Sequence, residues 1–276
     1  HQRDAAVDRD LRRGGAQPDL EIRYLRGREC IRLHWHRLVA AGALWNPASL
    51  WPDRALLDRA AEDLEPVARA ADSTFSRQAS AYLAFCREDL AGCRDAVASI
   101  QAAGVPDADM LFLRALVQHL EALARIGLEP EERVRRLEAA LAIYSQALDA
   151  RWHFYECWML LSRCQLDRGM IDQAIGNFEV GLSVYPKDPL VHAFLGEALG
   201  GAAERSEAAG RPDAATHRSA AAARLDRALE LAPGHVPALL ARARLRAGRA
   251  LAGAPAAAGR ALEANPRAPQ TLPLLA

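Results

Sequence analysis

A repeated pattern of small, apolar and turn-forming residues constrains the fold of this chain most strongly. Its clearest copy, Tyr155–Pro186, holds one helix-forming stretch, a glycine at position 169, a second helix-forming stretch and a closing proline. Gly169 permits a tight turn, and Pro186 cannot continue a helix because it lacks a backbone N–H group. The segment therefore predicts a helical hairpin.

The side chains of this hairpin have the sizes that close helix packing requires. Trp158 and Leu161 lie three positions apart on one helical face, and Ser162 and Ala174 are small enough to let the two helices touch. Phe178 then fills the space toward the next unit. The residues predicted to pack the repeat are Trp158, Leu161, Ser162, Gly169, Ala174, Phe178, Leu182 and Pro186.

Neighbouring segments carry the same pattern in the same register. Trp152 stands thirty-four residues before Pro186, where a proline is expected, and further copies end at Pro233 and Pro266. The residues that carry the pattern are Phe75, Ala79, Tyr82, Ala96, Ile100 and Ala103 upstream, then Ala140, Tyr144, Ala147 and Leu148, then Ala221, Leu225, Ala228 and Leu229, and finally Ala261 and Leu262. Recurrence of the pattern after 33 or 34 residues, with a longer interval before Pro233, indicates stacked helical units.

The order of residues in Tyr155–Pro186 resembles the tetratricopeptide repeat: a tryptophan, a leucine-small pair, a turn glycine, an alanine, an aromatic residue, a small residue and a proline. The resemblance extends over residues 72–266. It implies an all-α fold, a right-handed α-solenoid of helical hairpins with about five repeats, preceded by an N-terminal helical cap.

Two of the units are longer than the others. Twelve residues separate Ser162 from Ala174, whereas twenty-five separate Ala115 from Ala140 and Gly196 from Ala221. In the first long unit, the apolar run 110–126 predicts an extended first helix. In the second, Gly200-Gly201 and Gly210-Arg211-Pro212 predict a longer polar loop or a frayed helix. The added length is either part of a binding face or a neutral elaboration.

The predicted organisation has four parts. Residues 1–18 form a flexible arm, 19–71 an N-terminal helical hairpin cap, 72–266 the solenoid and 267–276 a tail. The first helix of the cap is expected over Asp19–Leu44, with apolar side chains among its arginines. Those side chains are Ile22, Leu25, Ile31, Leu33, Leu38 and Val39.

The charge balance makes nucleic acid an unexpected partner, because 35 basic and 35 acidic side chains cancel. No apolar stretch is long enough to span a membrane. The chain begins with His1, which leaves a removed targeting or membrane segment as one alternative, so cytoplasmic and periplasmic locations both stay open. Lys187 is the single lysine, which suggests a GC-rich bacterial genome.

No residue pattern predicts catalysis, a metal site or a cofactor. His34 and His36 are two positions apart, so they point to different sides of a helix and would converge only on a strand. Of the five cysteines, Cys86 and Cys93 flank a predicted turn between helices, and a disulfide there is one alternative. Serine-nucleophile and phosphate-loop motifs do not occur.

The resemblance also assigns a partner-binding groove. In the tetratricopeptide repeat family the first helix of each unit lines a concave face that holds a partner. The positions of this sequence that match are Asp109, Phe112, Leu116 and His119, then Glu156, Met159, Arg163 and Leu166, then Leu190, Ala193 and Glu197. They contain no lysine or asparagine, so a mixed apolar groove with isolated charges is expected.

These observations favour a protein-interaction scaffold or adaptor that binds a partner peptide or helix and belongs to a larger bacterial complex. One alternative is a soluble tail or accessory domain of a membrane-associated bacterial enzyme or of a transport or assembly system. A second alternative is self-assembly through the ends of the solenoid. The protein partner itself has no signature in the sequence.

Overall fold

The computed structural model describes residues 18–40, 53–70, 73–103, 107–124 and 129–253, and these residues form helices connected by short turns. This confirms the predicted all-α solenoid class. In chain order the helices are α2 (Pro18–Ala40), α3 (Arg54–Ala68), α4 (Thr74–Cys86), α5 (Leu90–Ala103), α6 (Ala108–Ala124), α7 (Pro130–Ala150), α8 (Tyr155–Asp167), α9 (Ile171–Val184), α10 (Pro189–Ala208), α11 (Ala214–Leu231) and α12 (Val236–Gly253).

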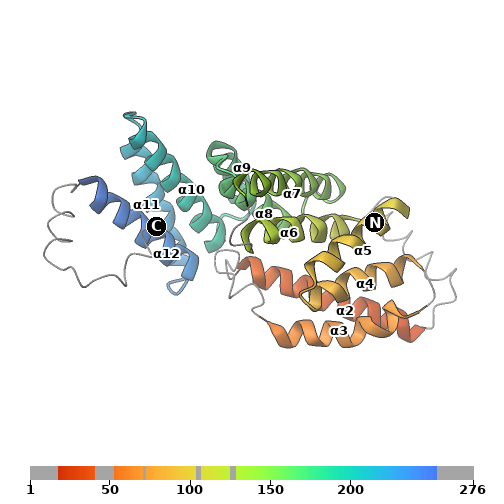
Figure 1. The fold of residues 1–276 in the computed structure, drawn as a ribbon. Helices are drawn as coiled ribbons and strands as arrows, with labels where there is room; N and C mark the ends of the chain where they lie inside the picture. Colours follow the sequence, from red (N-terminus) through yellow and green to blue (C-terminus); the bar gives the residue numbers. More distant parts are fainter. Residues whose placement is uncertain (1–17, 41–52, 71–72, 104–106, 125–128, 254–276) are drawn as a thin grey trace, which may run out of the picture. The chain divides into compact units, whose positions relative to one another are not determined.

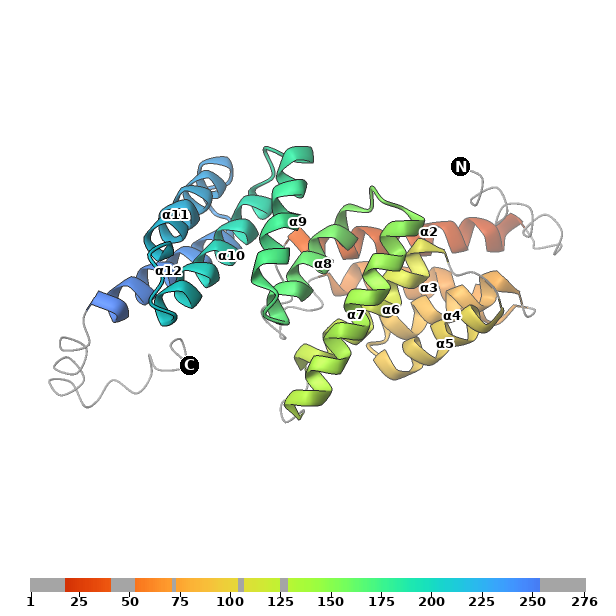
Figure 2. The ribbon, with the colours of Figure 1, turned by 90° about the horizontal axis from the view of Figure 1, so that it is seen from above.

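The chain divides into two compact units, one ending at Gly181 and the other beginning at Leu182. In the first unit, the hairpins α2–α3, α4–α5 and α6–α7 follow one another, and α8 packs against α7. In the second unit, α10 packs against both α11 and α12. Figure 2 shows these three helices of the second unit lying side by side.

Local capping interactions explain where several helices begin. Ser73 and Ser76 form a capping box at the start of α4, and the Asp188 side chain accepts a hydrogen bond from the Leu190 backbone before α10. Gly169 has a positive φ of 83°, and the backbone N–H of Met170 donates to the Gln165 carbonyl at 2.8 Å. The predicted glycine turn is therefore confirmed, because this conformation favours a residue without a side chain.

The second long unit differs from the sequence prediction. Helix α10 continues through Gly200 and Gly201 for 20 residues, and α11 begins at Ala214, so the expected long polar loop is wrong. Each glycine weakens a helix by about 1 kcal/mol relative to alanine. The adjacent Ala202 and Ala203 are buried, so tertiary packing supports the helix at this point. In the first long unit, α6 has 17 residues and α7 has 21, so both helices are extended there.

Helix α2 buries one face and exposes the other. Ile22, Leu25 and Leu33 are exposed, whereas Ile31, Leu38 and Val39 are buried. The buried side of α2 follows the spacing of Tyr24, Ile31, Trp35 and Leu38, which repeats about every seven residues and gives one continuous helical stripe. Three of the six apolar residues noted in the sequence therefore lie on the exposed side of the helix.

Some predictions fall outside the described residues. They are the arm before Pro18, the last four residues of the expected helix 19–44, the repeat residues Ala261 and Leu262 with Pro266, and the tail 267–276. Within the described part of the chain, no helix combines the length and the apolar character needed to cross a membrane.

Candidate helix-binding face of the first unit

The first helices α4, α6 and α8 share a face that holds α2. We call it the first-helix face and define it by Tyr82 of α4, Asp109 and Phe112 of α6, and Glu156 of α8. Each of these residues contacts the α2 side chains that the next paragraphs describe. Figures 1 and 2 agree that α2 lies beside α3 and α4 and that its C-terminal end approaches α8.

Aromatic rings form the centre of the first-helix face. The Trp35 ring lies 4.7 Å from the Phe112 ring and 6.1 Å from the Tyr82 ring, centroid to centroid, and all three side chains are fully buried. Phe112 also packs against Phe154 at 4.7 Å. Tilted aromatic contacts of this kind add to the stabilisation from burial alone.

A buried carboxylate lies next to this aromatic centre. Asp109 accepts hydrogen bonds from Arg32 of α2 at 2.5 and 2.9 Å and from Arg151 at 2.6 Å. Its side chain is only 4% exposed. A buried charge is tolerated only when it is paired and hydrogen-bonded, so Arg32 and Arg151 together make this position of Asp109 possible. Arg151 also stacks over the Phe154 ring at 3.8 Å.

A second polar chain connects α2, α4 and the start of α6. The Tyr24 hydroxyl donates to Gln78 Oε1 at 2.5 Å, and Gln78 Nε2 donates to Asp107 Oδ2 at 3.0 Å. Asp107 also caps α6 by accepting from the Met110 backbone at 2.9 Å. Burial raises the pKa of Asp107, and the negative charge of Asp109 raises it further.

The end of α2 reaches α8 at the rim of the face. His36 Nδ1 lies 3.1 Å from Glu156 Oε1, and the His36 ring is 6.1 Å from the Tyr155 ring. His36 is more than half exposed, whereas Glu156 is largely covered. Helix α2 therefore contacts all three of the first helices α4, α6 and α8.

The structure brings the predicted groove residues of α6 and α8 together and buries most of them. Asp109, Phe112, Leu116, His119 and Met159 are buried, and Glu156, Arg163 and Leu166 are partly exposed. In the second unit, Leu190 and Ala193 are buried, and Glu197 is partly exposed with its carboxylate 3.2 Å from Arg244. Few of these side chains present a free surface.

Deeper in the first unit, one cluster links three helices. His119 Nε2 of α6 lies 3.0 Å from Asp167 of α8, and Arg163 donates to the same carboxylate at 2.7 Å. The Tyr144 hydroxyl of α7 lies 3.4 Å from His119 Nδ1. Burial alone would raise the pKa of Asp167, but its bond to His119 and the charge of Arg163 lower it to about 2.

The predicted repeat-packing residues of α8 and α9 differ in burial. Leu161, Ser162, Ala174 and Phe178 are buried. Trp158 and Leu182 are only partly covered, and Pro186 is exposed at the closing turn. The Trp158 indole N–H donates to the Trp152 carbonyl at 2.5 Å.

The histidines and cysteines of the described ranges do not come together as a metal site. His34 is buried beside the Phe85 ring, and His36 faces Glu156, so the two side chains leave α2 in different directions. Burial, with a smaller contribution from Arg37, lowers the pKa of His34 to about 4. In the described ranges no three His, Cys, Asp or Glu side chains are placed to hold a metal.

All five cysteines are thiols in this structure, so the Cys86–Cys93 disulfide is not formed. Burial raises the pKa of Cys86 to about 12, which makes its reactive thiolate form rare.

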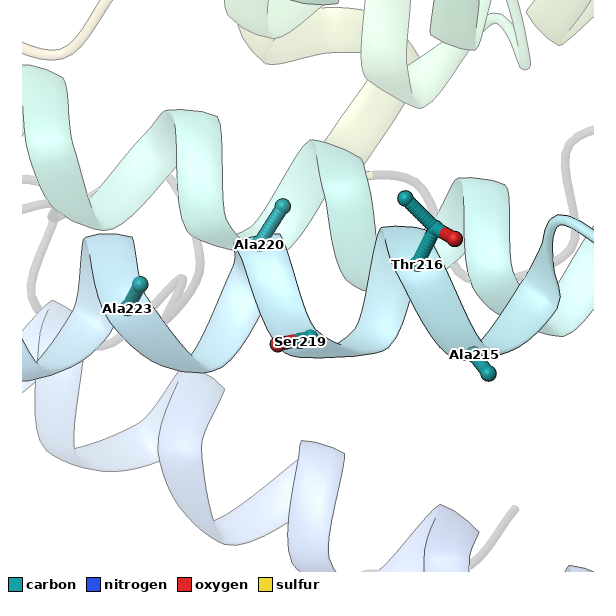
Figure 3. A pocket seen from close by; sticks show the side chains of 5 residues that line it. All are labelled: Ala215, Thr216, Ser219, Ala220 and Ala223. Atoms are coloured by element: carbon teal, nitrogen blue, oxygen red, sulfur yellow. The ribbon is translucent and has the colours of Figure 1, made fainter.

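A shallow hollow of about 560 Å³ lies on α11 in the second unit. Figure 3 shows its lining, a row of small side chains along one helix: Ala215, Thr216, Ser219, Ala220 and Ala223. The hollow is open to solvent and has no charged lining residue. It offers few contacts for specific recognition.

Sequence reasoning missed the residues by which α2 occupies the first-helix face: Arg32, Trp35 and His36. The seven-residue spacing of Tyr24, Ile31 and Leu38 was the available signal for the buried stripe of α2. The sequence contains no comparable signal for the helices against which that stripe packs.

Comparisons with known proteins agree with the helical hairpins. The family model described as a tetratricopeptide repeat matches residues 134–198, from within α7 to within α10. No curated protein matches the sequence. One similar solved structure is titled "Crystal structure of YrrB: a TPR protein with an unusual peptide-binding site"; it is 17% identical with a TM-score of 0.47, over 73% of this chain and 88% of that chain. Residues 134–198 are therefore similar to a tetratricopeptide repeat.

Proposed function

We propose that this chain is a protein-interaction subunit that holds a helical segment of a partner on the first-helix face. The observation that carries the proposal is chemical. One face of α4, α6 and α8 combines an aromatic centre, a buried carboxylate and a rim carboxylate, and this face packs against a helix through side chains. Helix-in-groove recognition uses side chains spaced three, four and seven residues apart, and α2 has this spacing.

The test is affinity purification of the tagged full chain with two matched variants. Glu156→Arg reverses a rim charge of the first-helix face, and Glu179→Arg makes the same charge change on α9, where the side chain is exposed. We expect proteins retained by the wild type and by Glu179→Arg to be lost from Glu156→Arg. Equal retention by all three chains, with unchanged helicity, would contradict binding at this face.

The substitution Arg163→Glu is a poorer probe. Arg163 neutralises the buried Asp167 at 2.7 Å, so a glutamate there would place two carboxylates together. Loss of binding in that variant would then report a damaged core and not a changed groove.

A further inference from the structure

We propose that α2 is an intramolecular ligand of the first-helix face, and that the partner presents a basic amphipathic helix built on the same pattern. That pattern has a small residue, an arginine and a large aromatic residue in the places of Gly27, Arg32 and Trp35. The inference rests on the proposed function, because it names the class of partner that the face accepts and the segment that competes with it.

The reach of α2 distinguishes it from an ordinary repeat helix. In a solenoid each unit contacts its immediate neighbours. Helix α2 packs on its own hairpin partner α3 and also contacts Tyr82 of α4, Phe112 of α6 and Glu156 of α8. It therefore lies across successive units, which is how a bound helix lies in a groove.

The arginine requirement follows from Asp109. This carboxylate is nearly fully buried and is paired with Arg32 and Arg151. When α2 leaves, Arg151 remains but one of the two cations is lost, and a partly unpaired buried charge is strongly unfavourable. A helix that replaces α2 must therefore supply a cation at this position. Glu156 at the rim favours a second basic or histidine side chain one turn further along.

The requirement for an aromatic and a small residue in the partner helix follows from the shape of the space that Trp35 and Gly27 occupy. Trp35 is 1% exposed and lies against Tyr82 and Phe112, as a buried tryptophan anchor does in an interface. A Cβ atom on Gly27 would lie 2.5 Å from Leu64 Cγ of α3, so a larger side chain there would hold the helix away from α3, which lies beside the helix along the face. A partner helix needs both features to reach the depth at which α2 is bound.

Replacement of α2 by a partner helix is energetically favoured over undocking of α2 alone. Undocking α2 with no replacement would expose Tyr24, Ile31, Trp35, Leu38 and Val39 together, which burial opposes strongly. A partner helix with the same pattern restores that burial. Its remaining disadvantage is that α2 is tethered, at an effective concentration on the order of millimolar. Weakening the grip of α2 should therefore strengthen binding of a competing helix.

The experiment uses full-length chains and a fluorescent peptide with the sequence of residues 18–40, followed by anisotropy. We expect weak binding to the wild type, binding about tenfold tighter to the Arg32→Ala chain, and about a hundredfold tighter to the Trp35→Ala chain, because the apparent affinity scales with the fraction of open face. Arg23→Ala is the matched control, since Arg23 pairs with Asp19 inside α2 and should leave binding unchanged.

A peptide carrying Trp35→Ala or Gly27→Leu should bind none of these chains. If the Trp35→Ala chain loses its helicity, the Arg32→Ala chain carries the test. Equal peptide affinity for wild-type and Arg32→Ala chains, or binding that ignores both peptide substitutions, would overturn the proposal.

The two proposals fail in different ways. Partner capture that depends on Glu156, combined with a peptide that never exchanges, would reject α2 as a ligand and keep the binding function. Peptide exchange, combined with partner capture that does not depend on Glu156, would keep α2 as a ligand of the face and reject the proposed partner-binding function.

Discussion

The two lengthened hairpins, α6–α7 and α10–α11, have the same spacing between their equivalent small residues but pack by different means. In α6–α7 the contact is made by large side chains, with Phe112 and Tyr144 rings 6.0 Å apart and Glu121 paired to Arg136. In α10–α11 the backbones approach closely, and Gly196 faces Leu225 and the Ala221 carbonyl. Equal length therefore does not impose equal packing, and the two hairpins should respond to opposite kinds of substitution.

The largest effect is expected from removing bulk in the first hairpin. Phe112→Ala deletes a ring that is fully buried among Trp35, Tyr144 and Phe154, and should lower the free energy of unfolding by about 3–5 kcal/mol. Urea unfolding followed by tryptophan fluorescence isolates this unit, because all five tryptophans precede residue 159. Leu33→Ala, at an exposed site on α2, is the control. A loss below about 1 kcal/mol for Phe112→Ala would contradict ring packing as the main support of α6–α7.

Acid should weaken the contact between the first hairpin and α8 through Asp167. The pKa of this carboxyl is about 2 in the fold and about 3.9 in an unfolded chain. A pKa that folding depresses adds stability above the unfolded value, and that stability is lost as the pH falls through the folded value. The contribution is on the order of 2 kcal/mol. Wild type and Asp167→Asn should therefore differ in unfolding free energy at pH 6 and converge near pH 2. A constant difference across this range would reject the ion pair as its source.

Adding bulk should damage the second hairpin. In Gly196→Ala the new Cβ would lie 2.7 Å from Leu225 Cγ and 3.2 Å from the Ala221 carbonyl oxygen, so the helices must separate. We expect a loss of about 1–2 kcal/mol. Far-UV circular dichroism should detect an earlier transition while tryptophan fluorescence, which reports the first unit, stays unchanged. An unaltered dichroism curve would show that the close approach is not required.

The smallest effect is expected from Gly200→Ala, one helical turn after Gly196, and this substitution should raise the stability instead of lowering it. At Gly200 the nearest atom to a new Cβ is Leu245 Cδ1 at 3.7 Å, an ordinary contact distance. Gly200→Ala should therefore stabilise the protein by about 0.5–1 kcal/mol, because alanine restricts the unfolded chain and favours the helix. The matched pair Gly196→Ala and Gly200→Ala separates close packing from helix propensity in a single helix.

The sequence was sufficient for features that depend on neighbouring residues. The turn at Gly169 and the buried Ser162 and Ala174 follow from residue size and backbone freedom. The helix through Gly200 and Gly201 did not follow, because propensity favoured a break there and tertiary burial overrode it. The covering of Phe112 by Trp35 also could not be read from the sequence, since nothing local to either residue specifies a contact between α2 and α6.

The contact between His36 and Glu156 joins residues 120 positions apart. Helical repeats usually fold through local contacts, so each unit can form soon after it leaves the ribosome. Helix α2 is synthesised before α4, α6 and α8, so part of its binding surface is absent until α8 has been made. The part of its apolar stripe that α3 does not cover must remain exposed for most of the translation of this unit, a period in which chaperones or premature association would compete for it. The packing of α2 on α8 is thus a long-range step, so the first unit should fold more slowly than a chain of independent repeats.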